Sequence, residues 1–260
     1  MSNWNDTPNE ERRRDARPWY DTTLGRYVLE REQIYIDGVI SDIFGFHALQ
    51  LGMPAVDLLR TNRIPHKFCL DAKPTADVLA RYEELPIETQ SIDLLILPHI
   101  LEFAEHPHQI LREVDRVMMP EGRIIITAFN PWSLWGIRRW MRADARQYPW
   151  CGNFISLVRM KDWLSLLGFD VSAGKLACYV PPLTQQKWLD RCRFMEDAGD
   201  RWWAIGGGIY ILEAIKRVQG MRIITPAWND KAAPEKRLAT AQRAAGLRRT
   251  ARSANLRLVK

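Results

Sequence analysis

Two short apolar runs, with an amphipathic stretch between them, mark the middle of the chain. Residues 92–97 and 123–129 are rich in Ile and Leu and bounded by turn residues, a pattern typical of buried parallel strands. The intervening residues 107–118 carry apolar side chains at helical spacing, at Ile110, Leu111, Val114, Val117 and Met118. Pro120, Glu121 and Gly122 then end the helix. The pattern predicts a β-α-β unit with a right-handed crossover.

Similar runs extend the predicted sheet towards the N-terminus. Three more strands are predicted at residues 47–51, 66–70 and 78–82, and a short helix at residues 57–63. Residues 71–78 leave too little chain for a crossover helix, because parallel strands normally need a dozen or more linking residues. We therefore expect only a turn there.

The C-terminal half predicts how the sheet closes. Residues 161–167 predict an amphipathic helix that ends at Gly168. Residues 169–180 and 207–216 are apolar and predict an antiparallel hairpin, with a helical insert at residues 183–203 between its strands.

The segment before the first strand predicts one or two helices. Apolar side chains fall near helical spacing at Leu24, Tyr27, Val28, Ile34 and Tyr35, although Arg31 interrupts this face. We expect these helices to pack on the edge of the sheet. Trp19, Tyr20 and Tyr27 could also cover a bound ligand, but structural packing is the favoured interpretation.

Composition narrows the class of protein. The chain has 260 residues, of which 47% are hydrophobic and 26% charged, as in ordinary globular proteins. No apolar stretch is long enough to span a bilayer, and residues 1–17 predict a disordered polar arm in place of a secretory signal. Four cysteines and five histidines form no metal-binding spacing. We therefore expect reduced thiols, a cytoplasmic location and no metal.

The net charge of +6 belongs to the C-terminal end. Residues 231–260 carry nine Lys or Arg and one Glu, a net of +8, which leaves −2 for the remainder. We expect the tail at 227–260 to be disordered. Such a tail can bind nucleic acid or an anionic surface weakly through phosphate contacts, and a merely solvated tail explains the composition equally well.

Four consecutive motifs in the middle of the chain resemble those of a known family. They are Glu84-Leu85-Pro86-Ile87, Ile92-Asp93, HILEF at residues 99–103 and RVMMPEG at residues 116–122. Their order resembles the type 11 group of class I S-adenosylmethionine-dependent methyltransferases. The resemblance implies an α/β fold with a Rossmann-like, seven-stranded, mostly parallel sheet, helices on both faces and a C-terminal antiparallel hairpin.

The resemblance also implies a domain organisation. A methyltransferase-like domain would span residues 18–226. Its expected parts are a helical cap at 18–45, a cofactor-binding core at 47–131, a Trp/Arg-rich lid segment at 132–150 and a closing hairpin with its insert at 169–216.

The family pattern assigns residues to the cofactor S-adenosyl-L-methionine. Gly52 keeps one glycine of the turn that lets the backbone approach the cofactor, and Gln50, which replaces an acid, is also assigned to the cofactor. Pro54 replaces a glycine of the turn. The resemblance implies that Asp71, at the end of the second strand, accepts hydrogen bonds from the ribose hydroxyls. It likewise places Glu84 and Leu85 at the adenine, and Pro98 and His99 along the cofactor site.

Substrate-side and catalytic candidates follow the fourth and fifth strands. His99 is the histidine that could act as a general base, and a role in lining the cofactor site is favoured. Asn130, Trp132 and Trp135 are the substrate candidates. The Trp- and Arg-rich stretch at 132–150 allows three interpretations: a substrate lid, a packed helix or a segment at a membrane interface.

The favoured function is methyl transfer from S-adenosyl-L-methionine to a small-molecule acceptor. Proximity and orientation can supply most of the acceleration, so a dedicated base is not required. The alternative is a non-catalytic protein of the same fold, acting on RNA or a membrane surface through its basic tail. An NAD-binding domain is disfavoured because the G-x-G-x-x-G fingerprint is absent.

Overall fold

The computed structural model describes residues 16–141, 147–182 and 205–218, together with Lys187, Arg191, Met195, Glu196, Gly199 and Arg201. The expected N-terminal arm, the basic tail and most of the 183–203 insert lie outside these residues. The chain divides into two units, residues 1–219 and 220–260, and every described residue belongs to the first.

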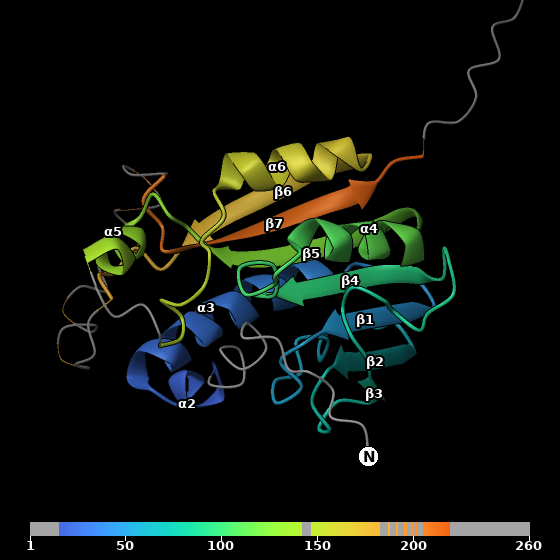
Figure 1. The fold of residues 1–260 in the computed structure, drawn as a ribbon, viewed down its shortest axis with the longest axis horizontal. Coiled ribbons are helices and arrows are strands. Elements are labelled where there is room, and N and C mark those ends of the chain that lie inside the picture. Colours follow the sequence, from blue (N-terminus) through green and yellow to red (C-terminus); the bar gives the residue numbers. More distant parts are fainter. Residues whose placement is uncertain are drawn as a thin grey trace, which may run out of the picture. The chain divides into compact units, whose positions relative to one another are not determined.

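A seven-stranded sheet with the order β3-β2-β1-β4-β5-β7-β6 forms the centre of this unit (Figure 1). The strands are β1 (His47–Leu51), β2 (His66–Asp71), β3 (Val78–Leu79), β4 (Ile92–Pro98), β5 (Met118–Phe129), β6 (Phe169–Ala177) and β7 (Ile209–Lys216). The first five strands pair in parallel, and β7 pairs antiparallel with β5 and β6. The expected mostly parallel, Rossmann-like sheet with a closing hairpin is confirmed.

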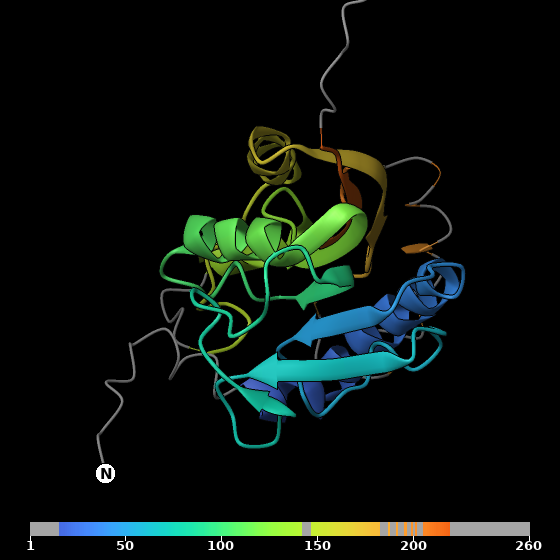
Figure 2. The same cartoon turned by 90° about the vertical axis from the view of Figure 1, so that its right-hand side faces the viewer.

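Helices cover both faces of the sheet, as expected. They are α2 (Ala16–Tyr20), α3 (Thr23–Ile40), α4 (Pro107–Val117), α5 (Leu134–Met141) and α6 (Leu157–Leu166). One apolar core joins α4 and α6 to one face of the sheet, and a second joins α3 to the other. Figure 2 shows α3 across the sheet from α4 and α6. Helix α3 therefore packs on a face of the sheet, and the expected position at its edge is wrong.

The two apolar cores explain why the central strands read as continuous apolar runs. Along β4, Leu95 and Leu97 belong to the core beneath α4, while Leu94 and Ile96 belong to the core beneath α3. All four side chains are fully buried. Successive side chains of a strand point to opposite faces, so a strand covered on both faces must be apolar at every position.

Some elements differ from the sequence-based expectations. Residues 57–63 form turns and no helix, because the amide N–H of Leu58 is donated to Gln50 Oε1 and that of Leu59 to Asp57 Oδ1. Strand β3 has only two residues, and the segment before it is a turn, as expected. Strand β5 starts at Met118, and its pairing with β4 shifts over the first residues.

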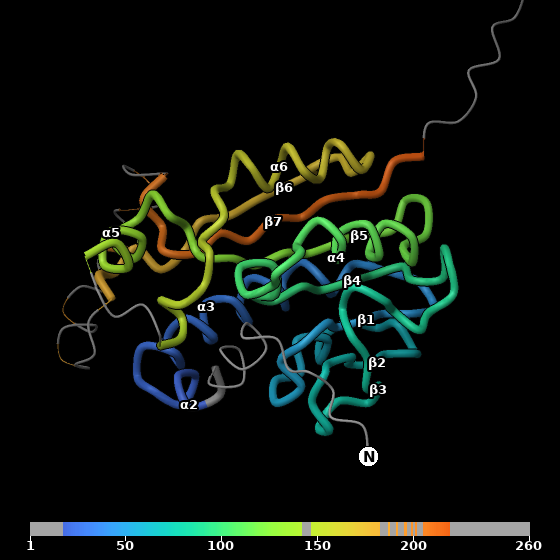
Figure 3. Tube along the Cα trace, viewed as in Figure 1, coloured from blue at the N-terminus to red at the C-terminus, as the bar shows by residue number. Residues whose placement is uncertain are grey.

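The parallel strands bring their carboxyl ends to one edge of the sheet. Strands β1, β2, β4 and β5 end there at Leu51, Asp71, Pro98 and Phe129. In the chain trace of Figure 3, α2 and α5 lie at this same end of the sheet. In open α/β sheets the carboxyl edge is where ligands bind, so the candidate site is sought here.

Candidate functional site

The loop after β1 is organised by one buried side chain. Gly52 and Met53 both have positive φ, 74° and 53°, a conformation in which glycine is unstrained. The Gln50 amide donates to the carbonyl oxygens of Gly52, Met53 and Val56 at 2.9, 3.1 and 2.8 Å. Its Oε1 accepts the N–H of Leu58 at 2.9 Å. Gln50 was predicted to bind the cofactor, but its polar atoms all bind the loop, so we assign it to shaping that loop.

Asp71 is the last residue of β2, the strand that neighbours β1 in the sheet. Its Oδ1 accepts two hydrogen bonds, from the backbone N–H of Ala72 at 2.7 Å and from the Tyr82 hydroxyl at 2.5 Å. Its Oδ2 makes no hydrogen bond to any described residue. The carboxylate is only 4% exposed. This geometry leaves one oriented acceptor oxygen, which is what the predicted contact with ribose hydroxyls requires.

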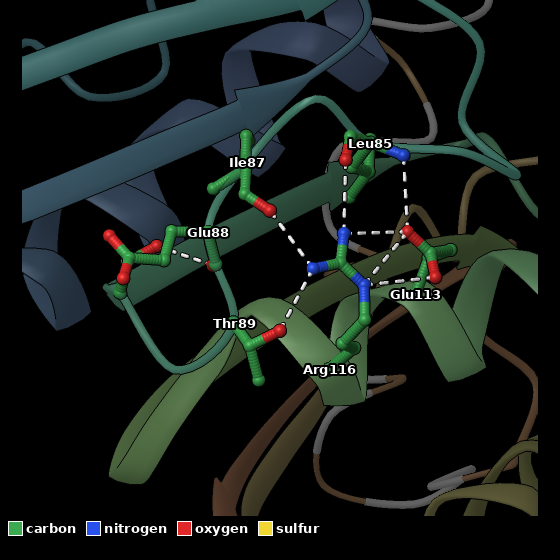
Figure 4. Close-up of polar contacts among 7 residues, drawn as sticks. Leu85, Ile87, Glu88, Thr89, Glu113 and Arg116 are labelled. Carbon is green, nitrogen blue, oxygen red and sulfur yellow. Dashed lines mark hydrogen bonds and ion pairs between the residues drawn. The ribbon is translucent and has the colours of Figure 1, made fainter.

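Leu85 is held by side chains of α4 (Figure 4). Its N–H is donated to Glu113 Oε2 at 3.1 Å, and its carbonyl oxygen accepts Arg116 Nη2 at 2.9 Å. Arg116 also reaches the carbonyl oxygen of Ile87 at 2.9 Å, and its hydrogen bonds lower the pKa of Glu113. The backbone of Leu85 is thus already satisfied, and Glu84 is exposed. If Glu84 and Leu85 contact adenine as predicted, they must do so through their side chains.

A buried ionic cluster lies at the end of β4. His99, which has a φ of 47°, directly follows Pro98. Its Nε2 is 2.6 Å from Glu32 Oε1 of α3, and its Nδ1 is 3.4 Å from Glu102 Oε1. Glu102 Oε1 also accepts the N–H of Phe129 at the end of β5. None of the three ionisable side chains is more than 1% exposed.

The cluster holds His99 in its charged form. Burial lowers the pKa of His99, but the carboxylates of Glu32 and Glu102 outweigh this and raise it to about 10. An imidazolium has no lone pair to accept a proton, so the geometry argues against His99 as a general base at neutral pH. One imidazolium faces two carboxyl groups, and Glu32 Oε2 and Glu102 Oε2 have no partner among the described residues.

Aromatic side chains pack beside the cluster. The Phe129 ring lies 4.2 Å from the His99 ring, and the Tyr20 and Tyr148 hydroxyls are 2.6 Å apart. Burial raises the pKa of Tyr148 well above its ordinary value. The wider group of ring contacts includes Trp19, Phe103, Trp135, Trp150 and Phe154. This group forms an apolar layer at the carboxyl edge, which the expected lid segment at 132–150 helps to build.

The three predicted substrate residues lie in different environments. The Asn130 amide donates to Ile205 and Gly207 carbonyl oxygens, and its Oδ1 accepts the N–H of Trp132. Trp135 is fully buried and donates its indole N–H to Val180. Both therefore support the local structure, and the predicted substrate contacts do not fit them. The Trp132 side chain is exposed.

Sequence reasoning missed Glu32, which completes the ionic cluster. Apart from Gly25, the buried positions of α3 fall four residues apart, at Leu24, Val28, Glu32, Ile36 and Ile40. The expected apolar face instead included Ile34, which is exposed. A glutamate in the middle of a stripe with this spacing was the available signal, because an unpaired charge is rarely buried.

The acceptor atoms at this edge match the groups of S-adenosyl-L-methionine that need acceptors. That molecule carries a sulfonium, an ammonium and two ribose hydroxyls. Asp71 Oδ2 suits the hydroxyls, and the second oxygens of Glu32 and Glu102 suit a cationic group. The residues present therefore fit the cationic and hydroxyl parts of the cofactor.

Comparison with known proteins agrees with the geometry. Residues 55–126 match the family model of the type 11 methyltransferase domain. An uncharacterized protein of Escherichia coli K12, YafS, is 30% identical over 155 residues, 59% of this chain and 65% of that protein. The chain thus spans less than two-thirds of this relative's length.

Solved structures share the fold. An S-adenosylmethionine-dependent methyltransferase of Thermotoga maritima, described as a possible histamine N-methyltransferase, has a TM-score of 0.57 at 14% identity, over 78% of this chain and 95% of that one. A chain from the complex of the Haloferax volcanii methyltransferase activator Trm112 has a TM-score of 0.56 at 14% identity, over 80% and 99%. Residues 55–126 are therefore similar to the type 11 methyltransferase domain, and the chain has the fold of S-adenosylmethionine-dependent methyltransferases, whose cofactor is S-adenosyl-L-methionine.

Proposed function

We propose that this chain transfers a methyl group from S-adenosyl-L-methionine to a small-molecule acceptor. The observation that carries the proposal is the Asp71 carboxylate at the carboxyl end of β2. The N–H of Ala72 and the hydroxyl of Tyr82 fix its Oδ1, so that Oδ2 is oriented as an acceptor. A structural capping residue does not need this second, tertiary hydrogen bond from Tyr82.

The chain's own residues would bind and orient the reactants. When bound, the cofactor supplies an electrophilic methyl group on a sulfonium. Asp71 would hold the ribose, and the turn at Gly52 would let the backbone approach closely. Glu32 and Glu102 would stabilise positive charge at this edge, while His99 balances part of their negative charge. Orientation supplies the main acceleration in this scheme, and no side chain is assigned as the base.

The aromatic layer supports an acceptor with an apolar part. The Phe129 ring lies beside the His99 ring, and Tyr148 and Trp150 are buried in the same apolar cluster as Phe129. Glu32, His99 and Glu102 are themselves buried, so water is excluded from them. Exclusion of water strengthens electrostatic interactions within the site. We place the activity in the cytoplasm, as the sequence predicts.

A non-catalytic binding protein is the second candidate. Gln50 replaces the family's acid, and its side-chain amide is hydrogen bonded within its own loop. The backbone N–H and carbonyl oxygen of Leu85 are hydrogen bonded to Glu113 and Arg116. Both features take groups away from cofactor binding. In this case the basic tail, which lies outside the described residues, would bind RNA or a membrane surface, as the sequence predicts.

The experiment compares the affinity of S-adenosylhomocysteine for the wild-type chain and for Asp71→Asn. We expect the variant to bind about tenfold or more weakly, because charge-assisted hydrogen bonds contribute roughly 1.5–3 kcal/mol. Asp170→Asn serves as the matched control, since Asp170 lies exposed on β6 at the opposite edge of the sheet. Equal affinities for all three proteins would remove Asp71 from the site. Lack of binding by the folded wild-type chain would favour the second candidate.

A further inference from the structure

Helix α5 exposes apolar side chains on the face that should be polar. Ile137, Trp140 and Met141 are 53%, 85% and 74% exposed, and Trp132, in the turn before the helix, is 73% exposed. Ile137, Trp140 and Met141 follow the i, i+3, i+4 spacing of a single helix face. The other face is apolar too, because Trp135 is fully buried in the aromatic layer. A surface helix normally turns charged or polar residues to solvent, so the outward face of α5 requires a separate explanation.

Arginines flank this apolar face. The Arg138 guanidinium lies 5.1 Å from the Trp150 ring, and that of Arg139 lies 5.2 Å from the Phe154 ring. Both side chains are partly exposed. Residues 131–142 contain three arginines and no acid. Helix α5 itself therefore combines an apolar outward face with two arginines and no acidic residue.

We propose that Trp132, Ile137, Trp140 and Met141, which we call the α5 surface, dock on an anionic lipid bilayer. Tryptophan is the residue preferred at the level of the lipid headgroups, where the indole ring is partly apolar and its N–H can hydrogen bond. Arginine borders attract anionic headgroups. The net charge of +8 on residues 231–260 has the same sign.

A bilayer fits the α5 surface better than a protein partner does. Its apolar residues lie within residues 132–141 and include two tryptophans beside two arginines, a combination that suits a shallow contact at the level of anionic lipid headgroups. No described helix is long and apolar enough to cross a membrane, so the contact would be peripheral.

This inference does not depend on methyl transfer. The α5 surface lies at the carboxyl edge of the sheet (Figure 1), but a bilayer would bind it whether or not the chain is an enzyme. Failure of the proposed function and failure of the docking surface would therefore be distinguishable.

The test measures co-sedimentation of the full chain with vesicles of phosphatidylcholine, with and without phosphatidylglycerol. The test variant is Trp140→Ser with Met141→Ser. The control variant is Val158→Ser with Leu166→Ser on α6, whose side chains are 68% and 85% exposed and so match in exposure. We expect the wild-type chain to bind anionic vesicles. The test variant should bind about tenfold or more weakly, and the control should match the wild type.

A second measurement uses the wild-type chain alone, so that it does not depend on the folding of a variant. Lipids brominated near the headgroup should quench part of the tryptophan fluorescence, and this part should persist when salt weakens electrostatic attraction. Absence of wild-type binding, or binding that salt abolishes and that the test variant retains in full, would overturn the proposal. The latter result would assign membrane binding to the basic tail.

Discussion

Gln50 shows how a single amide can organise a loop. Three carbonyl oxygens, from Gly52, Met53 and Val56, converge on its nitrogen, and the N–H of Leu58 meets its oxygen. A carboxylate at this position could keep only the bond to Leu58. The absence of the family's acid is therefore matched by a loop geometry that needs a donor.

Restoring that acid should consequently destabilise the chain. In Gln50→Glu the three carbonyl oxygens lose their donor inside a buried site, and we expect the free energy of unfolding to fall by about 3 kcal/mol. Gln109→Glu, an equivalent change at an exposed position of α4, should change it by less than about 0.5 kcal/mol. Urea unfolding measures both. Equal stability of the two variants would contradict the assigned role of Gln50.

The ionic cluster predicts a pH dependence of stability. The pKa of His99 is raised from 6.5 to about 10, so the folded chain retains a proton that the unfolded chain releases. The stabilisation is fully present below the unfolded pKa and is lost as pH rises towards the folded pKa. Between about pH 7 and about pH 8.5, the free energy of unfolding should fall by at most about 1.4 kcal/mol per pH unit.

Chemical denaturation at several pH values tests this, with Glu32→Gln as the comparison. This variant keeps a hydrogen-bonding group beside His99 but removes one carboxylate. The pKa of His99 should therefore fall, and the pH dependence of stability should weaken. At the upper end of the window the unfolded thiol of Cys178, with an ordinary pKa of 9.0, begins to ionise. It does so equally in the wild type and in Glu32→Gln, so the difference between the two proteins reports on His99. An unfolding free energy that is flat in the wild type would contradict a charged His99.

At the scale of elements, α4 controls the loop between β3 and β4. Arg116 binds carbonyl oxygens of Leu85 and Ile87, the hydroxyl of Thr89 and the carboxylate of Glu113. A planar guanidinium can reach these acceptors together, whereas an ammonium is a single point of donation. The helix thereby fixes the segment that the family pattern places near adenine.

Arg116→Lys should release this segment while keeping the charge. We expect a loss of about 1–2 kcal/mol in the free energy of unfolding, because the site is partly exposed and some bonds pass to water. Hydrogen exchange should become faster at residues 85–90. Arg112→Lys, at an exposed position of the same helix, should leave both quantities unchanged. Unaltered exchange in Arg116→Lys would show that the loop does not depend on α4.

The elements that the sequence predicts well are strands β4 and β5, which are covered on both faces, and helix α4, which is amphipathic. Their buried positions are nearly all apolar, so their type is visible in the pattern alone. The prediction of a helix at residues 57–63 is wrong, because backbone amides of this segment bind the side chains of Gln50 and Asp57. Side-chain bonds of this kind leave no periodic signal.

The candidate site was less visible in the sequence than the fold. Asp71 could be placed because it directly follows a predicted strand. The hydrogen-bond partner of Asp71 could not be placed in the same way. Tyr82 is eleven residues away, and the turn before β3 brings its hydroxyl to the Asp71 carboxylate. Glu32 lies 67 residues from His99, and only the packing of α3 on the sheet brings them together.

At the scale of the whole molecule, strand order determines where chemistry can occur. The order β3-β2-β1-β4-β5-β7-β6 brings the ends of β1, β2 and β4 side by side. Gly52, Asp71 and His99 therefore lie along one edge, although the sequence separates them. The central claim is that this edge binds S-adenosyl-L-methionine.

Calorimetric titration of the wild-type chain tests that claim most directly. The ligands are S-adenosyl-L-methionine and S-adenosylhomocysteine, with NAD as the control. We predict a dissociation constant near 1 μM, or about −8 kcal/mol, for the first two and no binding of NAD. A folded chain that binds none of the three, or that binds NAD alone, would contradict the account.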